Sequence, residues 1–239
     1  MKPIKSFTMA MAGLALSVVT SYAQLTLNFA STPGATIQFN GAASSFQFNS
    51  STLVFGPPIG NYYVNSQWAI GSETGGTGSA VGLLGVVNNG PFSYGPVTPL
   101  SPGVEIATVL GPLGALSIND GLGFLPVDYL TGDVSWIQVE TANSIGGINA
   151  SLLVNVYQLA YAGTNPDLAA LVAGGPGSMN VSFQFSPSMT LSQLSSGSGP
   201  YNSSFSGSIS VPEPMSAGVL LLGLGVLVCF QRFAQNRHS

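Results

Sequence analysis

Short segments in which apolar and polar residues alternate are the feature that most constrains the fold of this chain. The alternation is regular in residues 25–29, 36–39, 45–48 and 181–185. Successive side chains of a strand point to opposite faces, so one face of each segment suits a core and the other suits water. Gly, Pro, Asn and Ser bound these segments, as they do at turns between strands. The sequence therefore predicts half-buried β-strands.

Further segments rich in β-branched and aromatic residues extend the series. They are residues 61–70, 80–87, 105–110, 116–118, 134–141, 148–162 and 205–211. About ten strands at this spacing are typical of an antiparallel sandwich or barrel. We expect residues 24–210 to form one all-β domain, an antiparallel β-sandwich of the jelly-roll type. Gly/Pro-rich residues 71–79 and 88–103 are expected to be loops, and Ser/Gly-rich residues 195–204 are expected to be a loop or a spacer before the last strand.

One short helix is expected within this β domain. Asn165, Pro166 and Asp167 supply an N-cap, a first-turn proline and a first-turn acid, and Gly174 can close the helix. Residues 190–194 could add a single helical turn.

The aromatic residues of the strands are expected to anchor the core. Trp68, Trp136, Phe183 and Phe185 are the core candidates, and Tyr62, Tyr63, Tyr157 and Tyr161 fit either the core or its rim. An exposed aromatic stripe could instead stack on sugar rings. A carbohydrate-binding, lectin-like module is therefore the alternative function to keep open.

The basic residues are confined to the two ends of the chain. Lys2, Lys5, Arg232 and Arg237 are all four of them, and residues 24–210 also lack His and Cys. Ser-His-Asp and Cys-His catalysis need a base that this segment does not contain. Phosphate loops need a Lys, and nucleic-acid binding needs clustered Lys or Arg. We expect a non-catalytic domain with no cofactor and no nucleic-acid partner.

Carboxylates are the remaining chemical groups of this segment. Asp120, Asp128, Asp133 and Glu140 are the candidates for paired-carboxylate hydrolysis. Asp120, Asp128 and Asp133 are also weak candidates for calcium, which needs six to eight oxygen ligands. Asp120 and Asp133 each adjoin a Gly, which favours turns over catalysis or metal binding. We expect no metal site.

The N-terminus has the layout of a secretory signal peptide. Lys2 and Lys5 precede an apolar run over residues 7–19, and Ser21 and Ala23 are the small residues that a cleavage site needs. Residues 1–23 are expected to be removed between Ala23 and Gln24. The alternatives are an uncleaved anchor and a buried helix.

The C-terminus has the layout of a membrane span followed by a basic tail. Residues 211–214 read Val211, Pro212, Glu213 and Pro214, and uncharged residues 215–230 follow. A helix of this length is slightly shorter than a typical hydrocarbon core. Arg232 and Arg237, in the tail 231–239, are the expected stop-transfer residues that keep this end cytoplasmic. The alternative is a core helix of a globular domain.

This end resembles the PEP-CTERM sorting signal of bacterial exported proteins. The motif Pro212–Glu213–Pro214, the Gly/Leu-rich residues 220–225 and Arg232 follow in the order of that family. The separated Arg237 departs from the tight arginine cluster that the family often carries. The resemblance implies processing by an exosortase, a membrane anchor before processing, and a final place at the cell surface or in the extracellular matrix. It also associates the protein with exopolysaccharide and biofilm.

Overall fold

The structure is a computed structural model that describes residues 24–51, 65–120, 128–142, 150–197 and 199–212. Residues Gln24–Pro212 form one compact unit. The core residues of the described part all lie between Leu25 and Val211. The expected signal peptide (1–23) and the sorting segment from residue 213 onward lie outside the described residues, so their boundaries stay predictions.

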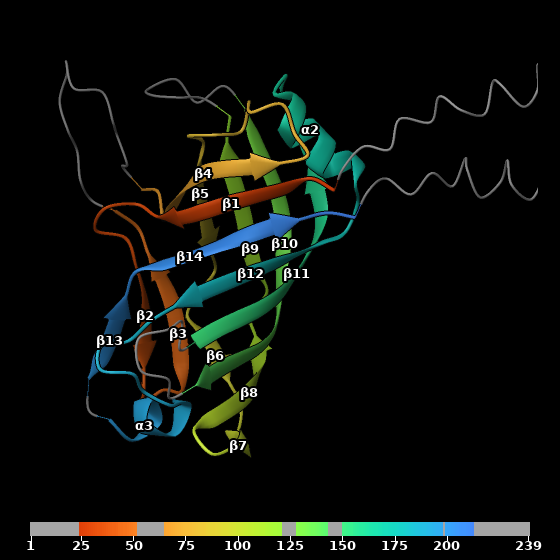
Figure 1. The fold of residues 1–239 in the computed structure, drawn as a ribbon. Coiled ribbons are helices and arrows are strands. Elements are labelled where there is room, and N and C mark those ends of the chain that lie inside the picture. The colour runs from red at the N-terminus through yellow and green to blue at the C-terminus, as the bar shows by residue number, and fades with distance from the viewer. Residues whose placement is uncertain (1–23, 52–64, 121–127, 143–149, 198, 213–239) are drawn as a thin grey trace, which may run out of the picture. The chain divides into compact units, whose positions relative to one another are not determined.

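Antiparallel strands close into a barrel (Figure 1). Its members, in chain order, are β1 (Thr26–Ser31), β4 (Trp68–Thr74), β5 (Leu84–Asn88), β9 (Gly114–Asn119), β10 (Tyr129–Ala142), β11 (Ala150–Ala160), β12 (Gly177–Phe183) and β14 (Phe205–Ser210). Around the barrel the order is β11-β12-β14-β1-β4-β5-β9-β10, and β10 pairs again with β11. This last pairing turns eight strands into a ring.

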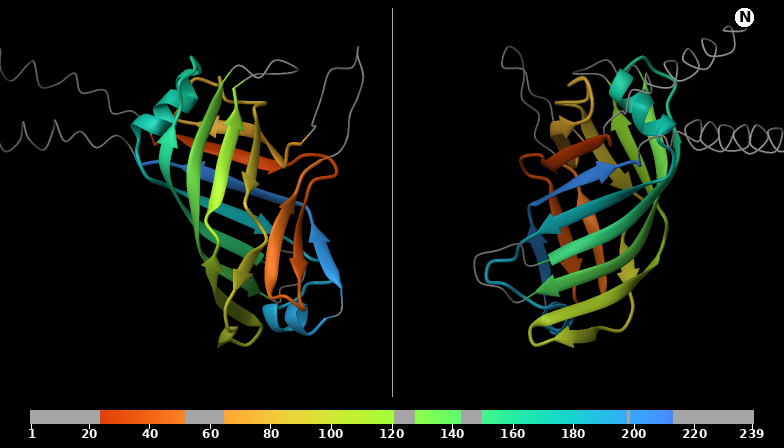
Figure 2. Two further views of the ribbon diagram at one scale, coloured as in Figure 1. Left: turned by 180° about the vertical axis from the view of Figure 1, so that it is seen from behind. Right: turned by 45° about the vertical axis from the view of Figure 1, so that its right-hand side comes forward.

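A second sheet branches from the far half of β10. There β10 pairs with β8 (Val104–Gly111), which also pairs with β6 (Phe92–Tyr94) and β7 (Thr98–Ser101). The sheet continues through β3 (Ser45–Asn49) and β2 (Thr36–Asn40) to β13 (Pro200–Ser203). Figure 2 shows β2, β3 and β13 side by side.

Aromatic side chains join this second sheet to the barrel. Phe46 on β3 meets Trp136 on β10 with ring centroids 5.3 Å apart. Phe39 on β2 meets Phe183 on β12 at 5.1 Å. Such pairs add to the free energy of burial, so the barrel and the second sheet share one core.

The expected sandwich is therefore wrong, and the domain is a closed antiparallel barrel with two short helices. Alternation identifies the buried face of each strand, but it is the same for an open sheet and a closed one. The closure depends on long strands, because β10 pairs with β9 over its first half, with β8 over its second half and with β11 along most of its length.

Most expected elements are present, and three expected loops are partly strand. The helix over residues 165–174 is α2 (Pro166–Ala173), capped by Asn165, and the single turn is α3 (Leu191–Ser196). The expected loop 88–103 contains β6 and β7, and the expected loop 195–204 contains β13. Strand β4 also extends to Thr74, inside the expected loop 71–79. These strands are short or Gly/Ser-rich, so they lack the pattern on which the prediction depended.

The expected core anchors are confirmed. Trp68, Trp136, Phe183 and Phe185 are all buried. Tyr157 and Tyr161 are half-buried at the rim, and Tyr62 and Tyr63 lie outside the described residues.

Candidate functional site

Two of the candidate acidic residues, Asp120 and Asp128, are brought together through the backbone of Asp128. Asp120 accepts hydrogen bonds from the backbone N–H of Asp128 at 2.9 Å and from the hydroxyl of Tyr161 at 2.5 Å. The same Tyr161 oxygen accepts the N–H of Asn165 at 2.8 Å. Burial, and next the hydrogen bond to Asp120, raise the pKa of Tyr161. This network joins the end of β9 to the segment before α2, which is a structural role.

The other two candidate carboxylates lie elsewhere on β10. Asp133 stands opposite Tyr157 of β11, and Glu140 stands opposite Ile106 of β8. Among the residues that the structure describes, no group of three or more His, Cys, Asp and Glu side chains could hold a metal ion. The four carboxylates therefore do not converge on one site.

Asp167 is the expected first-turn acid of α2, and it has a second role that the sequence did not reveal. Its carboxylate is 1% exposed and accepts hydrogen bonds from the N–H groups of Thr77, Ser79 and Ala80 and from the hydroxyls of Thr77 and Ser79. Burial alone would raise its pKa, but these hydrogen bonds outweigh burial and lower the pKa to about 2. Because its oxygens are already satisfied, Asp167 holds a loop and is a poor ligand for a metal.

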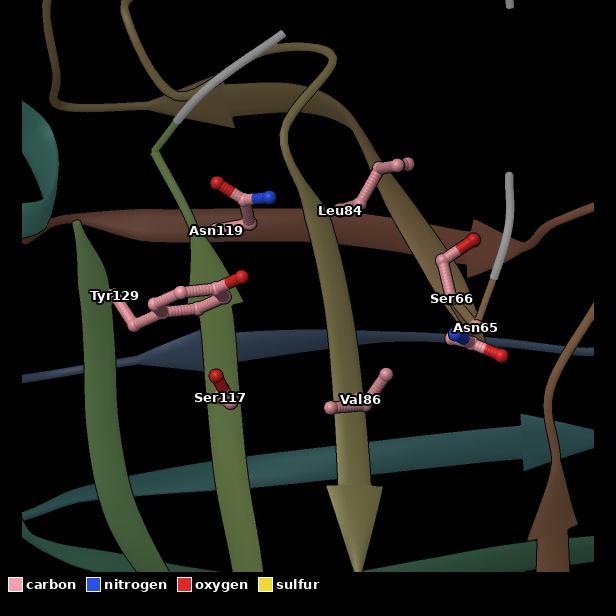
Figure 3. Close-up of a pocket in the computed structure, with 7 residues that line it drawn as sticks. All are labelled: Asn65, Ser66, Leu84, Val86, Ser117, Asn119 and Tyr129. Carbon is pink, nitrogen blue, oxygen red and sulfur yellow. The ribbon is translucent and has the colours of Figure 1, made fainter. Parts of the chain in front are cut away.

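A groove lies on the outer face of β5, β9 and β10 (Figure 3). Its first depression has a volume of about 220 Å³. The register sets Leu84, Asn119 and Tyr129 directly opposite one another across the three strands. In Figure 3 the Tyr129 ring lies across β9 between the side chains of Asn119 and Ser117. The ring is 48% exposed, so one of its surfaces is open to a ligand.

The outward-facing residues of the same three strands form two further rows of three, each with its members opposite one another. The second row is Val86, Ser117 and Thr131, and the third is Asn88, Ala115 and Asp133. A second depression, of about 360 Å³, is lined by Ser117 and by members of the third row, together with Gln158 of β11. The two depressions share Ser117 and therefore form one groove.

The groove has the chemistry of a site for an uncharged polar ligand. Asp133 is the one ionisable carboxylate among the lining residues of both depressions. The other polar groups are amides and hydroxyls, which both donate and accept hydrogen bonds. Apolar contact comes from Leu84 and Val86, and Tyr129 adds an aromatic face. This combination of a few oriented polar groups with apolar surface is typical of small-ligand sites.

Sequence reasoning missed this groove. Tyr129 was not among the singled-out aromatics, because it precedes the segment 134–141 that was expected to be a strand. A signal existed in the outward positions of residues 84–88 and 114–119, which carry both small polar and apolar side chains. That signal becomes a site only when the three strands are placed side by side.

The structure describes only some of the residues expected to act in signal cleavage, sorting and stop-transfer. Val211 is 1% exposed and donates its N–H to the carbonyl of Leu25 at 3.3 Å, so it belongs to the folded domain. Pro212 and Gln24 are exposed. The remaining candidates, Glu213, Pro214, Arg232, Arg237 and Ala23, lie outside the described residues. Neither helix of the described part has the length and apolar character that crossing a membrane requires.

Comparisons of the chain with protein-family models, with curated proteins and with solved structures found no match.

Proposed function

We propose that this chain is a non-catalytic exported protein of the bacterial cell surface or extracellular matrix, sorted by its C-terminal segment. The observation that carries the proposal is the confinement of Lys and Arg to positions 2, 5, 232 and 237. Basic residues next to an apolar span favour the cytoplasmic side of the membrane, so their positions beside the two terminal apolar runs support export of the domain between them. In this proposal the motif 212–214 is recognised by an exosortase, and residues 215–230 anchor the chain in the membrane until processing.

The sorting proposal is tested in a host that carries an exosortase. A chain ending at Pro212 keeps the buried Val211 and should be released into the medium. The full chain should be processed near Glu213, and Glu213→Ala should leave the C-terminus intact, as mass spectrometry would show. Ser216→Ala is a matched control within the apolar segment. A wild-type chain that is found in the cytosol with its N-terminal and C-terminal segments both intact would overturn the proposal.

A second function, binding of neutral carbohydrate, is favoured by the groove. The row Leu84, Asn119 and Tyr129 sets apolar contact, an amide and an exposed aromatic face beside one another. Sugar rings present hydroxyls at their edges and apolar C–H faces, which match this set. Binding would link the exported domain to the exopolysaccharide that the family resemblance implies.

Carbohydrate binding is tested with the full chain on an array of neutral glucans, xylans, mannans and galactans. Tyr129→Ala should weaken the binding seen with the wild type by about tenfold or more. Leu110→Ala is a matched control, because Leu110 is 68% exposed on β8 and is not a lining residue of the groove. Equal binding by the two variants would place any carbohydrate site elsewhere.

A further inference from the structure

We infer that the groove continues into a longer path that binds an extended, neutral polysaccharide chain rather than a single sugar. This inference rests on the carbohydrate-binding function proposed above and specifies its ligand. It depends on a third depression and on a row of amides that the groove described so far does not include.

The third depression extends the groove past the end of β5. It has a volume of about 220 Å³ and shares Asn88 with the second depression. Its lining includes Asn89 and, from β3 on the second sheet, Gln47 and Asn49. Asn88 therefore connects the outer face of the barrel to the second sheet. Polar surface predominates in this lining, and its polar side chains are again amides and a hydroxyl, without a cation.

A row of hydrogen-bonded amides carries the path onward across the second sheet. Gln47 donates to Gln38 on β2 at 3.1 Å, and Gln38 donates to Asn202 on β13 at 3.0 Å. Gln47 also donates to Asn49 at 3.0 Å. A primary amide has two N–H donors and two acceptor lone pairs. These mutual bonds orient the side chains and leave hydrogen-bonding capacity for a ligand, which lowers the entropy lost on binding.

The length of the path exceeds that of a monosaccharide or disaccharide. Leu84 and Asn88 are four residues apart on β5, a distance of about 13 Å at the usual rise of a strand. The step from β3 through β2 to β13 adds about 10 Å at the usual spacing of neighbouring strands. A ligand that contacts both Tyr129 and Asn202 must therefore be a chain of several sugars.

The charges of the domain select a neutral chain. Residues 24–210 contain no Lys, Arg or His that could pair with an acidic sugar. Asp133, which lines the second depression, would repel a carboxylate or sulfate at that position. An anionic polysaccharide would lose hydration without gaining a counter-charge.

The test is an affinity series with the full chain and neutral oligosaccharides of two to six units, prepared from whichever neutral polymer of the array binds. Oligogalacturonates of the same lengths are the anionic comparison. We expect the hexamer to bind at least about tenfold more tightly than the dimer. Oligogalacturonates of every length should show no detectable binding.

Variants at the far end of the path distinguish the extended site from the groove alone. Gln47→Ala should weaken the hexamer several-fold and leave dimer affinity unchanged, whereas Tyr129→Ala should weaken both. Gln184→Ala is the matched control, because Gln184 is an exposed amide that lines a separate depression. Tryptophan fluorescence checks that each variant is folded.

Each failure has a distinct meaning. Affinity that stops rising at the dimer, or a hexamer unaffected by Gln47→Ala, would overturn the extended path while the groove keeps its proposed function. Equal binding of oligogalacturonates would overturn the selection for neutral chains. A wild-type chain that binds none of the neutral polymers would overturn the carbohydrate function itself.

Discussion

Asp167 accepts two hydrogen bonds from Thr77, one from its backbone N–H at 2.8 Å and one from its hydroxyl at 2.9 Å. The two residues are 90 positions apart in the sequence. Asp167 lies in the first turn of α2, and Thr77 lies in the segment between β4 and β5. The contact fixes that segment against the helix, and it does so through a charged group, because the carboxylate is buried and ionised.

The first prediction concerns the acid stability of the domain. The folded pKa of Asp167 is about 2, below its ordinary value of 3.8. The stabilisation is present above pH 3.8 and is lost as the pH falls towards 2, and it amounts to about 2 kcal/mol. Urea unfolding followed by tryptophan fluorescence should show this loss in the wild type. Asp167→Asn should be less stable than the wild type near neutral pH, and its stability should depend less on pH. Identical slopes for the wild type and Asp167→Asn would contradict the assignment.

The second prediction concerns Gly85, which pairs with Trp68 across β4 and β5. A Cβ atom at Gly85 would overlap the indole ring of Trp68, which is fully buried. Gly85→Ala should lower the free energy of unfolding by about 3 kcal/mol, at the upper end of overpacking effects. Gly71→Ala is the matched control, because a Cβ there meets no atom within 4 Å. Equal midpoints in urea for the two variants would show that the strand pairing is wrong.

The third prediction concerns the hydroxyl of Tyr161, which lies between Asp120 and Asn165. Tyr161→Phe leaves the carboxylate and the N–H without this partner and should cost about 1–3 kcal/mol of unfolding free energy. Burial and Asp120 raise the pKa of the phenol. The associated stability is therefore present below pH 10 and declines as the pH rises through the folded value. Burial also raises the pKa of Tyr94, so ultraviolet titration should show a late phase that Tyr161→Phe reduces by one tyrosine and does not abolish.

The fourth prediction follows from the distribution of basic residues. Trypsin cleaves after Lys and Arg, which are absent between Lys5 and Arg232. The domain should therefore remain intact with trypsin even when it is unfolded in urea. Chymotrypsin should degrade the unfolded domain and serves as the control for enzyme access. A tryptic fragment within residues 24–210 on mass spectrometry would contradict this prediction.

The fifth prediction concerns the boundary between the folded domain and the sorting segment. Val211 is buried and packs so closely on Gly174 that a Cβ atom there would overlap its side chain. A chain that ends at Ser210 should be less stable than one that ends at Pro212 by about 1.5–3 kcal/mol, the usual value for burying a valine side chain. Thermal unfolding of the two truncated chains measures the difference. Equal melting temperatures would show that the core ends before Val211.

The helix α2 shows how much residues close in sequence decide. The side chain of Asn165 caps the helix by accepting the N–H groups of Asp167 and Leu168, both at 3.1 Å. These partners are two and three residues away, so composition and order alone predicted them. The carboxylate of Asp167 finds its partners 87 to 90 residues earlier, and no local pattern indicates them.

The candidate site shows the same limit more strongly. Tyr129, Asn119 and Leu84 come from three strands, and their proximity depends on the register of two strand pairs. A shift of one residue in either pair would turn one of these side chains into the core. The groove could therefore not be inferred before the strands were placed.

The sequence by itself determined that the domain is built of half-buried strands, that Trp68 and Trp136 lie in its core, and that Lys and Arg are confined to its flanks. These properties follow from side-chain periodicity and composition, which each segment carries on its own. The tertiary structure alone decided that β10 and β11 close the ring and that the outer faces of β5, β9 and β10 form a groove. The physical reason is that alternation specifies which face of a strand is buried, whereas the choice of neighbouring strand and register is set by packing among residues far apart in the chain.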